Sequence, residues 1–255
     1  MYEIYALKVA EVAVDSPHMF YQTDYGKKTT IYYYFFCLKG NGYTILLDTG
    51  IPPDEVAFRG ITGTSREELL SRIDVSPKDI DAIILTHLHG DHFGGPEIYP
   101  NCIFYVQRKE FEYWSEDVQR FHNIFIHKFP HGESAVAIEA LQKLNFQGRV
   151  RFLDGDAEVY PGIRTIWCGA HTPGSQFVSV QTKRGTVLCC SDFIDYYRNL
   201  DEQIPVGILT SLVEWLKNIV KIEMMHLPRE SIIPGHDPQL TKMFPEVAED
   251  VIKIA

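Results

Sequence analysis

The chain has 255 residues, of which 45% are hydrophobic and 23% charged, and its formal net charge is −10. This composition is typical of a globular protein and excludes a disordered one, and the acidity argues against a nucleic-acid partner. No apolar run approaches the roughly 18 residues that span a bilayer, and the start Met1-Tyr2-Glu3 places an acid where a signal peptide is positive. We therefore expect a cytoplasmic protein without a membrane partner.

The N-terminal half begins with a predicted hairpin. Apolar and β-branched runs at 31–38 and 43–47 are separated by Asn41-Gly42, a strong hairpin turn signal. Helix starts are predicted at Ser65, which is followed by acids that suit the helix dipole, and at Ser76-Pro77. The same kind of short apolar run predicts further strands at 83–85, 103–106, 150–153, 163–168, 177–182, 186–190 and 231–233.

Two longer segments have helical character. Residues 206–225 predict an amphipathic helix, and 108–146 predict a mostly helical insert rich in aromatic residues. Its aromatic residues are Phe111, Tyr113, Trp114, Phe121, Phe125 and Phe129. Strands alternate with helices in both halves of the chain, which indicates an α/β layered architecture with its chemistry on loops at strand ends. We expect one domain over residues 1–255.

The five cysteines predict no disulfide framework. Their number is odd and their spacing irregular, and four of them lie in or beside apolar strand-like segments. Buried reduced thiols are the expected state.

The motif His87-Leu88-His89-Gly90-Asp91-His92 carries the strongest chemical signal. Three imidazoles and a carboxylate follow a short apolar strand within six residues. On an extended segment His87 and His89 point to the same side, so they can share one cation. Gly90 permits a change of direction, after which Asp91 and His92 can serve a second cation. Imidazole with carboxylate suits zinc, and iron, manganese or cobalt less exclusively.

Three distant residues repeat one local context. His171, Asp192 and His236 each follow a short apolar strand and lie at the start of a loop. Taken singly, each is more often an ordinary loop residue or turn former. Because all three share the context of the motif, we interpret them as the remaining metal ligands.

These residues resemble the metallo-β-lactamase superfamily, whose motif His-x-His-x-Asp-His is followed by a distant His, Asp and His. The resemblance covers about residues 30–237 and includes Leu46-Leu47-Asp48-Thr49-Gly50. It implies a single αβ/βα sandwich domain. It also implies that His87, His89 and His171 hold one metal, that Asp91, His92 and His236 hold a second, and that Asp192 bridges the two. Asp48 would be a buried supporting residue rather than a ligand.

Within the superfamily, the compact chain resembles the N-acyl homoserine lactonases and 4-pyridoxolactonase. His171-Thr172-Pro173-Gly174 and Ile233-Pro234-Gly235-His236 match that branch. Two positions differ. Ser175 stands where these lactonases often have His. Shortly after the bridging Asp these lactonases also carry a Tyr that contacts the substrate carbonyl, whereas here Asp195 lies three residues after Asp192. Tyr196 and Tyr197 come next and are our candidates for that hydrogen bond.

The resemblance implies hydrolysis of a small lactone by a hydroxide that bridges two divalent metals, with Asp91 passing a proton to the leaving oxygen. The partner is then a small-molecule substrate, and a homodimer is possible. Alternatives are another acyl hydrolase acting on a thioester, amide or cyclic amide, a phosphodiesterase, and an iron oxidoreductase on the same scaffold. The acidity disfavours a phosphodiesterase, and the seven candidate ligands favour two metals over a single iron.

Overall fold

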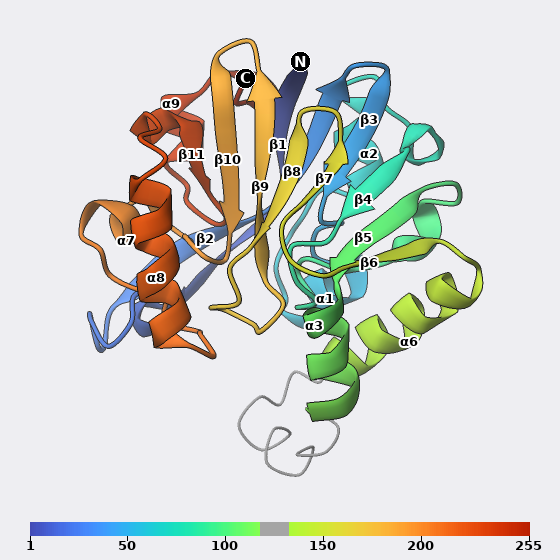
Figure 1. Ribbon diagram of the computed structural model, residues 1–255. Helices are drawn as coiled ribbons and strands as arrows, with labels where there is room; N and C mark the ends of the chain where they lie inside the picture. Colours follow the sequence, from blue (N-terminus) through green and yellow to red (C-terminus); the bar gives the residue numbers. More distant parts are fainter. Residues whose placement is uncertain (118–132) are drawn as a thin grey trace.

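The computed structural model describes residues 1–117 and 133–255. Its strands form one hydrogen-bonded network in the order β11-β10-β9-β1-β2-β3-β4-β5-β6, whose two halves face each other (Figure 1). Short strands at its margins are paired β7 with β8, β8 with β9, and β12 with β13. The bounds are β1 Tyr2–Asp15, β2 Lys28–Gly40, β3 Tyr43–Leu47, β4 Ala82–Ile84, β5 Ile103–Gln107, β6 Val150–Leu153, β7 Ala157–Tyr160, β8 Ile163–Trp167, β9 Gln176–Thr182, β10 Gly185–Ser191, β11 Ile232–Pro234, β12 Glu246–Ala248 and β13 Val251–Lys253.

Alternation along the strands creates three buried layers. In β4, Ala82 and Ile84 face the other half of the sheet, whereas Ile83 faces outward. In β10, Val187 faces inward and Leu188 faces outward. Because successive side chains of a strand point to opposite faces, strands buried on both faces need helices outside the sheets.

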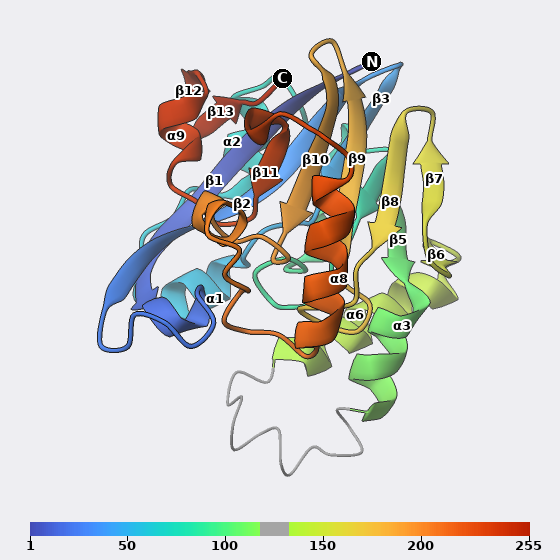
Figure 2. The same ribbon diagram turned by 60° about the vertical axis from the view of Figure 1, so that its left-hand side comes forward.

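Helices cover both outer faces (Figure 2). On the N-terminal half, α2 (Arg66–Ser71) and α6 (Glu133–Phe146) pack against the outward strand residues, and α8 (Leu212–Glu223) does so on the C-terminal half through Trp215 and Ile219. The shorter α-helices are α1 Pro53–Phe58, α3 Arg108–Glu112, α7 Tyr197–Asp201 and α9 Leu240–Met243. The predicted αβ/βα sandwich is confirmed.

Local signals in the sequence are confirmed where they are strongest. β2 and β3 form the predicted hairpin, with φ of 53° at Asn41 and 82° at Gly42, as a primed two-residue turn requires. Ser65 caps α2 by accepting a hydrogen bond from the Glu68 N–H. The strand β1, whose 14 residues carry an irregular burial pattern, was not predicted.

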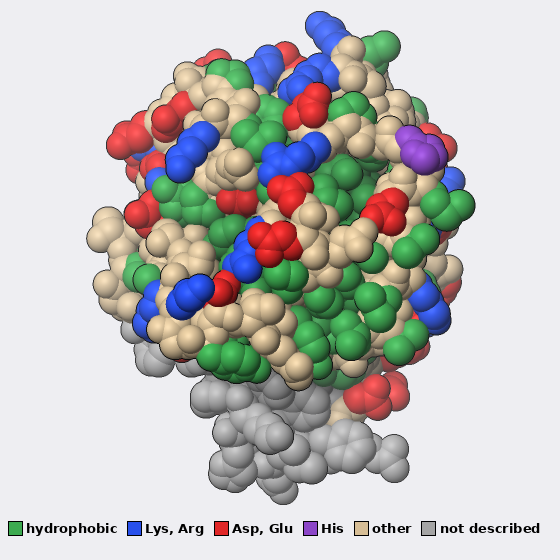
Figure 3. Space-filling model, turned by 90° about the vertical axis from the view of Figure 1, so that its left-hand side faces the viewer, with side chains coloured by type: hydrophobic (Ala, Val, Ile, Leu, Met, Phe, Trp, Pro, Cys, Tyr) green, Lys and Arg blue, Asp and Glu red, His purple; other side chains and the backbone are tan. Residues whose placement is uncertain are grey.

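The predicted start of the 206–225 helix is wrong. α8 begins at Leu212, because the N–H groups of Thr210 and Ser211 donate to Ala170 O and the Ser211 side chain caps the helix. Tertiary hydrogen bonds thus keep Thr210 and Ser211 outside the helix. The outer face of α8 exposes several apolar side chains, on a side where hydrophobic groups gather (Figure 3). They are Val213, Leu216, Val220 and Met224. A homodimer stays a prediction.

The aromatic-rich segment is helical at both ends. α3 continues into a π-helix at Tyr113–Asp117, and α6 closes the segment. Phe121, Phe125 and Phe129 lie outside the described residues. Within residues 1–117 and 133–255, no helix is both long enough and apolar enough to cross a membrane.

Candidate metal centre

The candidate ligands lie where several strands end at one edge of the sandwich. β4 runs into the loop of the histidine motif, β8 precedes His171, β10 precedes Asp192 and β11 precedes His236. β10 and β11 are parallel, and β8 runs in the same direction because both β8 and β10 are antiparallel to β9. Their carboxyl ends therefore meet at the same edge, and residues separated by 149 positions, from His87 to His236, become neighbours.

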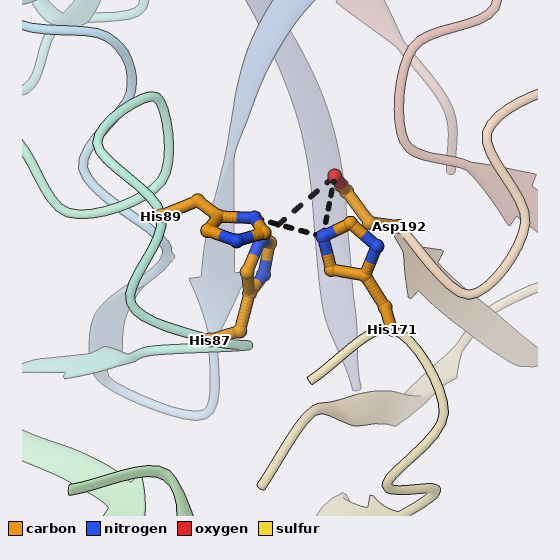
Figure 4. Close-up of side chains that lie close together, drawn as sticks. All are labelled: His87, His89, His171 and Asp192. Carbon is orange, nitrogen blue, oxygen red and sulfur yellow. Dashed lines mark hydrogen bonds and ion pairs between the residues drawn. The ribbon is translucent and has the colours of Figure 1, made fainter. Parts of the chain in front are cut away.

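His87, His89, His171 and Asp192 form the first cluster, in which one ligand atom from each lies within 4.8 Å of all the others. Figure 4 shows the three rings and the carboxylate pointing toward one another. His89 Nδ1 lies 3.0 Å from His87 Nε2 and 2.8 Å from His171 Nε2. Nitrogens packed this closely around a common point are the arrangement that a tetrahedral cation requires.

Asp91, His92 and His236 form the second cluster. Asp91 Oδ2 lies 3.4 Å from His92 Nε2 and 3.8 Å from His236 Nε2. Asp91 is only half-buried, whereas both histidines are buried. The carboxylate of this cluster therefore lies on its more open side.

Asp192 lies between the two clusters and divides its oxygens between them. Oδ2 faces the first cluster, 3.4 Å from His171 Nε2 and 3.8 Å from His87 Nε2. Oδ1 faces the second, 3.0 Å from His92 Nε2 and 3.1 Å from His236 Nε2. One carboxylate thus presents a separate oxygen to each group of imidazoles.

The chemistry of the donor atoms fits metal ions. His92 Nε2 is buried and makes no hydrogen bond with the described residues, although Asp192 Oδ1 lies 3.0 Å away. The opposite ring nitrogens of His171 and His236 face backbone oxygens, with Nδ1 2.6 Å from Ile208 O and 2.9 Å from Tyr32 O. With the proton on Nδ1, the Nε2 lone pair faces the cluster, which is how metal-binding histidines are held.

Asp48 holds the histidine motif in place through contacts to Thr86 and His92. Its carboxylate accepts hydrogen bonds from Thr86 N and Thr86 Oγ1, both at 2.7 Å, and lies 2.8 Å from His92 Nδ1. Thr86 Oγ1 also lies 2.8 Å from Ser191 Oγ, next to Asp192. Asp48 and Ser191 have φ of 63° and 48°, left-handed values that are uncommon outside glycine and often occur at functional sites.

Glu110 is a supporting residue that the sequence did not reveal. It is fully buried at the start of α3, and its Oε1 accepts hydrogen bonds from Leu88 N (3.0 Å) and Trp114 Nε1 (2.7 Å). Its Oε2 accepts from Thr172 Oγ1 (2.6 Å) and Gly174 N (3.0 Å). Leu88 lies between two candidate ligands and Thr172 follows a third, so one carboxylate ties the loops of the first cluster together. The only sequence signal was an acid at a predicted helix start.

The electrostatics of the two clusters differ. Burial lowers the pKa of His89 to about 3 and lowers the pKa of His171, so both are neutral and have free lone pairs at pH 7. At the second cluster, burial also acts to lower the pKa of His236, but Asp192 outweighs it and raises that pKa to about 9. The electrostatic potential at the second cluster is therefore more negative than at the first, and it stabilises positive charge there.

The structure places the predicted tyrosines in packed surroundings. Tyr196 Oη donates to Thr30 O at 2.6 Å and its ring packs on Phe20. The Tyr197 hydroxyl is buried in the layer between the sheet halves and makes no hydrogen bond with the described residues. A hydrogen bond from either hydroxyl to a substrate stays a prediction. Asp195, by contrast, lies beside Asp192 and His236.

A two-sheet sandwich with helices outside and clustered His and Asp residues at one edge defines a metal-dependent hydrolase class. A sequence model of the metallo-beta-lactamase superfamily matches residues 27–236. The chain belongs to this superfamily and is a hydrolase of it, so the family expected from the motif is confirmed.

Individual relatives include several lactonases. The chain is 28% identical over 245 residues to an N-acyl homoserine lactonase of Bacillus thuringiensis, covering 87% of this chain and 88% of that enzyme. It is 26% identical over 181 residues to the N-acyl homoserine lactonase AttM of Azorhizobium caulinodans, covering 68% and 64%. A crystal structure of a quorum-quenching N-acyl homoserine lactone lactonase shares the fold, with a TM-score of 0.75, 24% identity and 94% of each chain covered.

Proposed function

We propose that the chain holds two divalent cations, most simply zinc, one at each cluster, and that Asp192 bridges them. The observation that carries this proposal is the division of the Asp192 oxygens, each of which faces a different set of imidazole nitrogens. The ligand set is the one predicted from the sequence: His87, His89 and His171 for the first cation, and Asp91, His92 and His236 for the second.

The proposed reaction is the hydrolytic opening of a small lactone. Support comes from the lactonase names of the relatives and from a structural neighbour described as a dizinc quorum-quenching lactonase in complex with a homoserine product. That neighbour, at 18% identity and a TM-score of 0.74, shares the fold. The sequence relatives and the geometry of the site together support a lactone as the substrate class.

The cations, when bound, supply Lewis acidity and lower the pKa of water toward neutral pH. The chain's own part is to fix its donor atoms before substrate arrives. Ile208 O and Tyr32 O hold the rings of His171 and His236, and Glu110 accepts hydrogen bonds from the backbone N–H groups of Leu88 and Gly174 in the two loops of the first cluster. Asp91 is the half-buried acid of the site, and we assign to its carboxylate the acceptance of a proton from the attacking water and its transfer to the leaving alkoxide oxygen.

One aromatic side chain, that of Trp114, walls the first cluster on the side of His89. The ring of Trp114 lies against that of His89, with centroids 5.4 Å apart, and its Nε1–H is bound by Glu110. Trp114 is 7% exposed, and the accessible part of its indole offers an apolar surface beside the metal position to an acyl chain or aromatic ring, as in most small-molecule sites. This wall supports a lactone with an apolar substituent.

A substrate panel tests the proposal. The zinc- and manganese-loaded enzyme is assayed against acyl homoserine lactones of different chain lengths, aromatic lactones, a glutathione thioester and a phosphodiester. We expect turnover of at least one lactone, lost on chelation and restored by added metal. Asp91→Asn should weaken the second metal, and it should lose most of kcat even when excess metal keeps both positions filled. Turnover of the thioester or phosphodiester with no lactone opened would refute the proposed substrate class but would not contradict the proposed metal centre.

A further inference from the structure

Asp195 is a buried carboxylate at the second cluster that the superfamily motif does not include. It lies in the loop between β10 and α7, three residues after Asp192, and is 2% exposed. A ligand atom of Asp195 lies within 4.8 Å of ligand atoms of Asp192 and His236. The His236 backbone N–H donates to Asp195 O at 3.0 Å, which fixes the two residues side by side.

Asp195 Oδ1 differs from the carboxylate oxygens of neighbouring buried acids. It is buried, and no donor among the described residues reaches it. Asp48 and Glu110 accept several hydrogen bonds each, and Asp237 accepts from Tyr197 N and Gln239 N, both at 2.8 Å. A buried carboxylate without donors is costly unless a positive charge balances it. The groups within ligand distance of it are the Asp192 carboxylate and the His236 imidazole of the site.

We infer that Asp195 supplies a further carboxylate ligand to the cation of the second cluster. This inference rests on the proposed dinuclear centre. The cation would then have Asp91, Asp192 and Asp195 beside His92 and His236, whereas the first cluster offers three imidazoles and one carboxylate oxygen. Carboxylate-rich sites favour harder cations and higher coordination numbers, and imidazole-rich sites favour zinc. The two positions therefore differ in metal preference, with Mn²⁺ competing better for the second.

Metal titration of the metal-free full-length protein tests this. Wild type, Asp195→Asn and Asp195→Ser are titrated with Zn²⁺ and with Mn²⁺ by calorimetry, and bound metal is measured by elemental analysis. The control is Asp81→Asn, an exposed acid that accepts a hydrogen bond from Thr44 N. We expect both Asp195 variants to bind the second Mn²⁺ equivalent more than about tenfold more weakly. The first Zn²⁺ equivalent should bind as in wild type.

Thermal unfolding separates a ligand from a merely structural residue. Because no donor is lost at Oδ1, Asp195→Asn should not lower the Tm of the metal-free protein, but it should reduce the rise in Tm that Mn²⁺ produces. The inference is overturned if both variants bind two equivalents of each metal with wild-type affinity, or if the metal-free Tm falls as much as the metal-loaded Tm. A wild-type protein that binds only one metal would instead refute the dinuclear centre.

Discussion

Glu110 Oε2 and Thr172 Oγ1 form a 2.6 Å hydrogen bond that joins α3 to the loop after His171. Through its other oxygen Glu110 also binds Leu88 N, between His87 and His89. A side chain at Gly174 would collide with the Glu110 backbone, so the two segments approach as closely as glycine allows. The Glu110 carboxylate therefore ties together the two loops that carry His87, His89 and His171.

Glu110→Gln should destabilise the fold and weaken the first metal. The amide NH₂ would face hydrogen-bond donors where a carboxylate oxygen now accepts, at a cost of about 1–3 kcal/mol in the free energy of unfolding. Denaturant unfolding of the metal-free variant measures that cost, and zinc titration measures the affinity of the first cluster for Zn²⁺. The matched control is Glu112→Gln, an exposed acid in the same helix. Equal effects of the two substitutions would contradict the role given to Glu110.

Asp192→Ala should remove both metals, whereas His236→Ala should weaken mainly the second. The reason is that Asp192 presents one oxygen to each cluster, while His236 Nε2 lies only in the second. Metal content per chain after gel filtration without added metal distinguishes the two variants. Asp192→Ala protein that keeps two metals and full activity would show that this carboxylate is no bridge.

Asp48→Asn should lower metal affinity at the second cluster without displacing the backbone. Asn tolerates the left-handed φ of 63° at this position, but it loses the charge beside His92 Nδ1. Loss of such a partner typically costs about 10- to 100-fold in metal affinity. Titration of the second Zn²⁺ equivalent provides the measurement, with the exposed Asp54→Asn as control. An unchanged second affinity would mean that Asp48 serves only the fold.

The thiols should resist modification in the folded protein. All five cysteines are free and buried, and burial raises the pKa of Cys102 to about 11 and that of Cys37, Cys168 and Cys189 to about 12. Because the thiolate is the reactive form, an aromatic disulfide reagent at pH 8 should label none rapidly. In the denatured chain all five cysteines should react, releasing five equivalents of the reagent's aromatic thiolate. Rapid stoichiometric labelling of the native protein would contradict the buried thiols.

The sequence predicted the parts of this protein whose signals are local. The histidine motif lies within six residues, and the Asn41-Gly42 turn and the Ser65 cap act over two to four residues, so each is readable without a partner segment. The sandwich fold was predicted from the family resemblance that the motif carries. The 206–225 helix was predicted too long, because hydrogen bonds to Ala170 O, from a distant strand end, hold its first residues out of the helix.

The sequence by itself determined which residues have metal-binding chemistry and that they follow strand ends. Only the tertiary structure decided how they share the site: that Asp192 turns one oxygen to each cluster, that Glu110 ties the two loops, and that Asp195 Oδ1 is buried beside Asp192 and His236 with no donor among the described residues. Such relationships depend on which strand ends meet and on the direction of each side chain, and no spacing along the chain encodes either, since both follow from the packing of the whole sandwich.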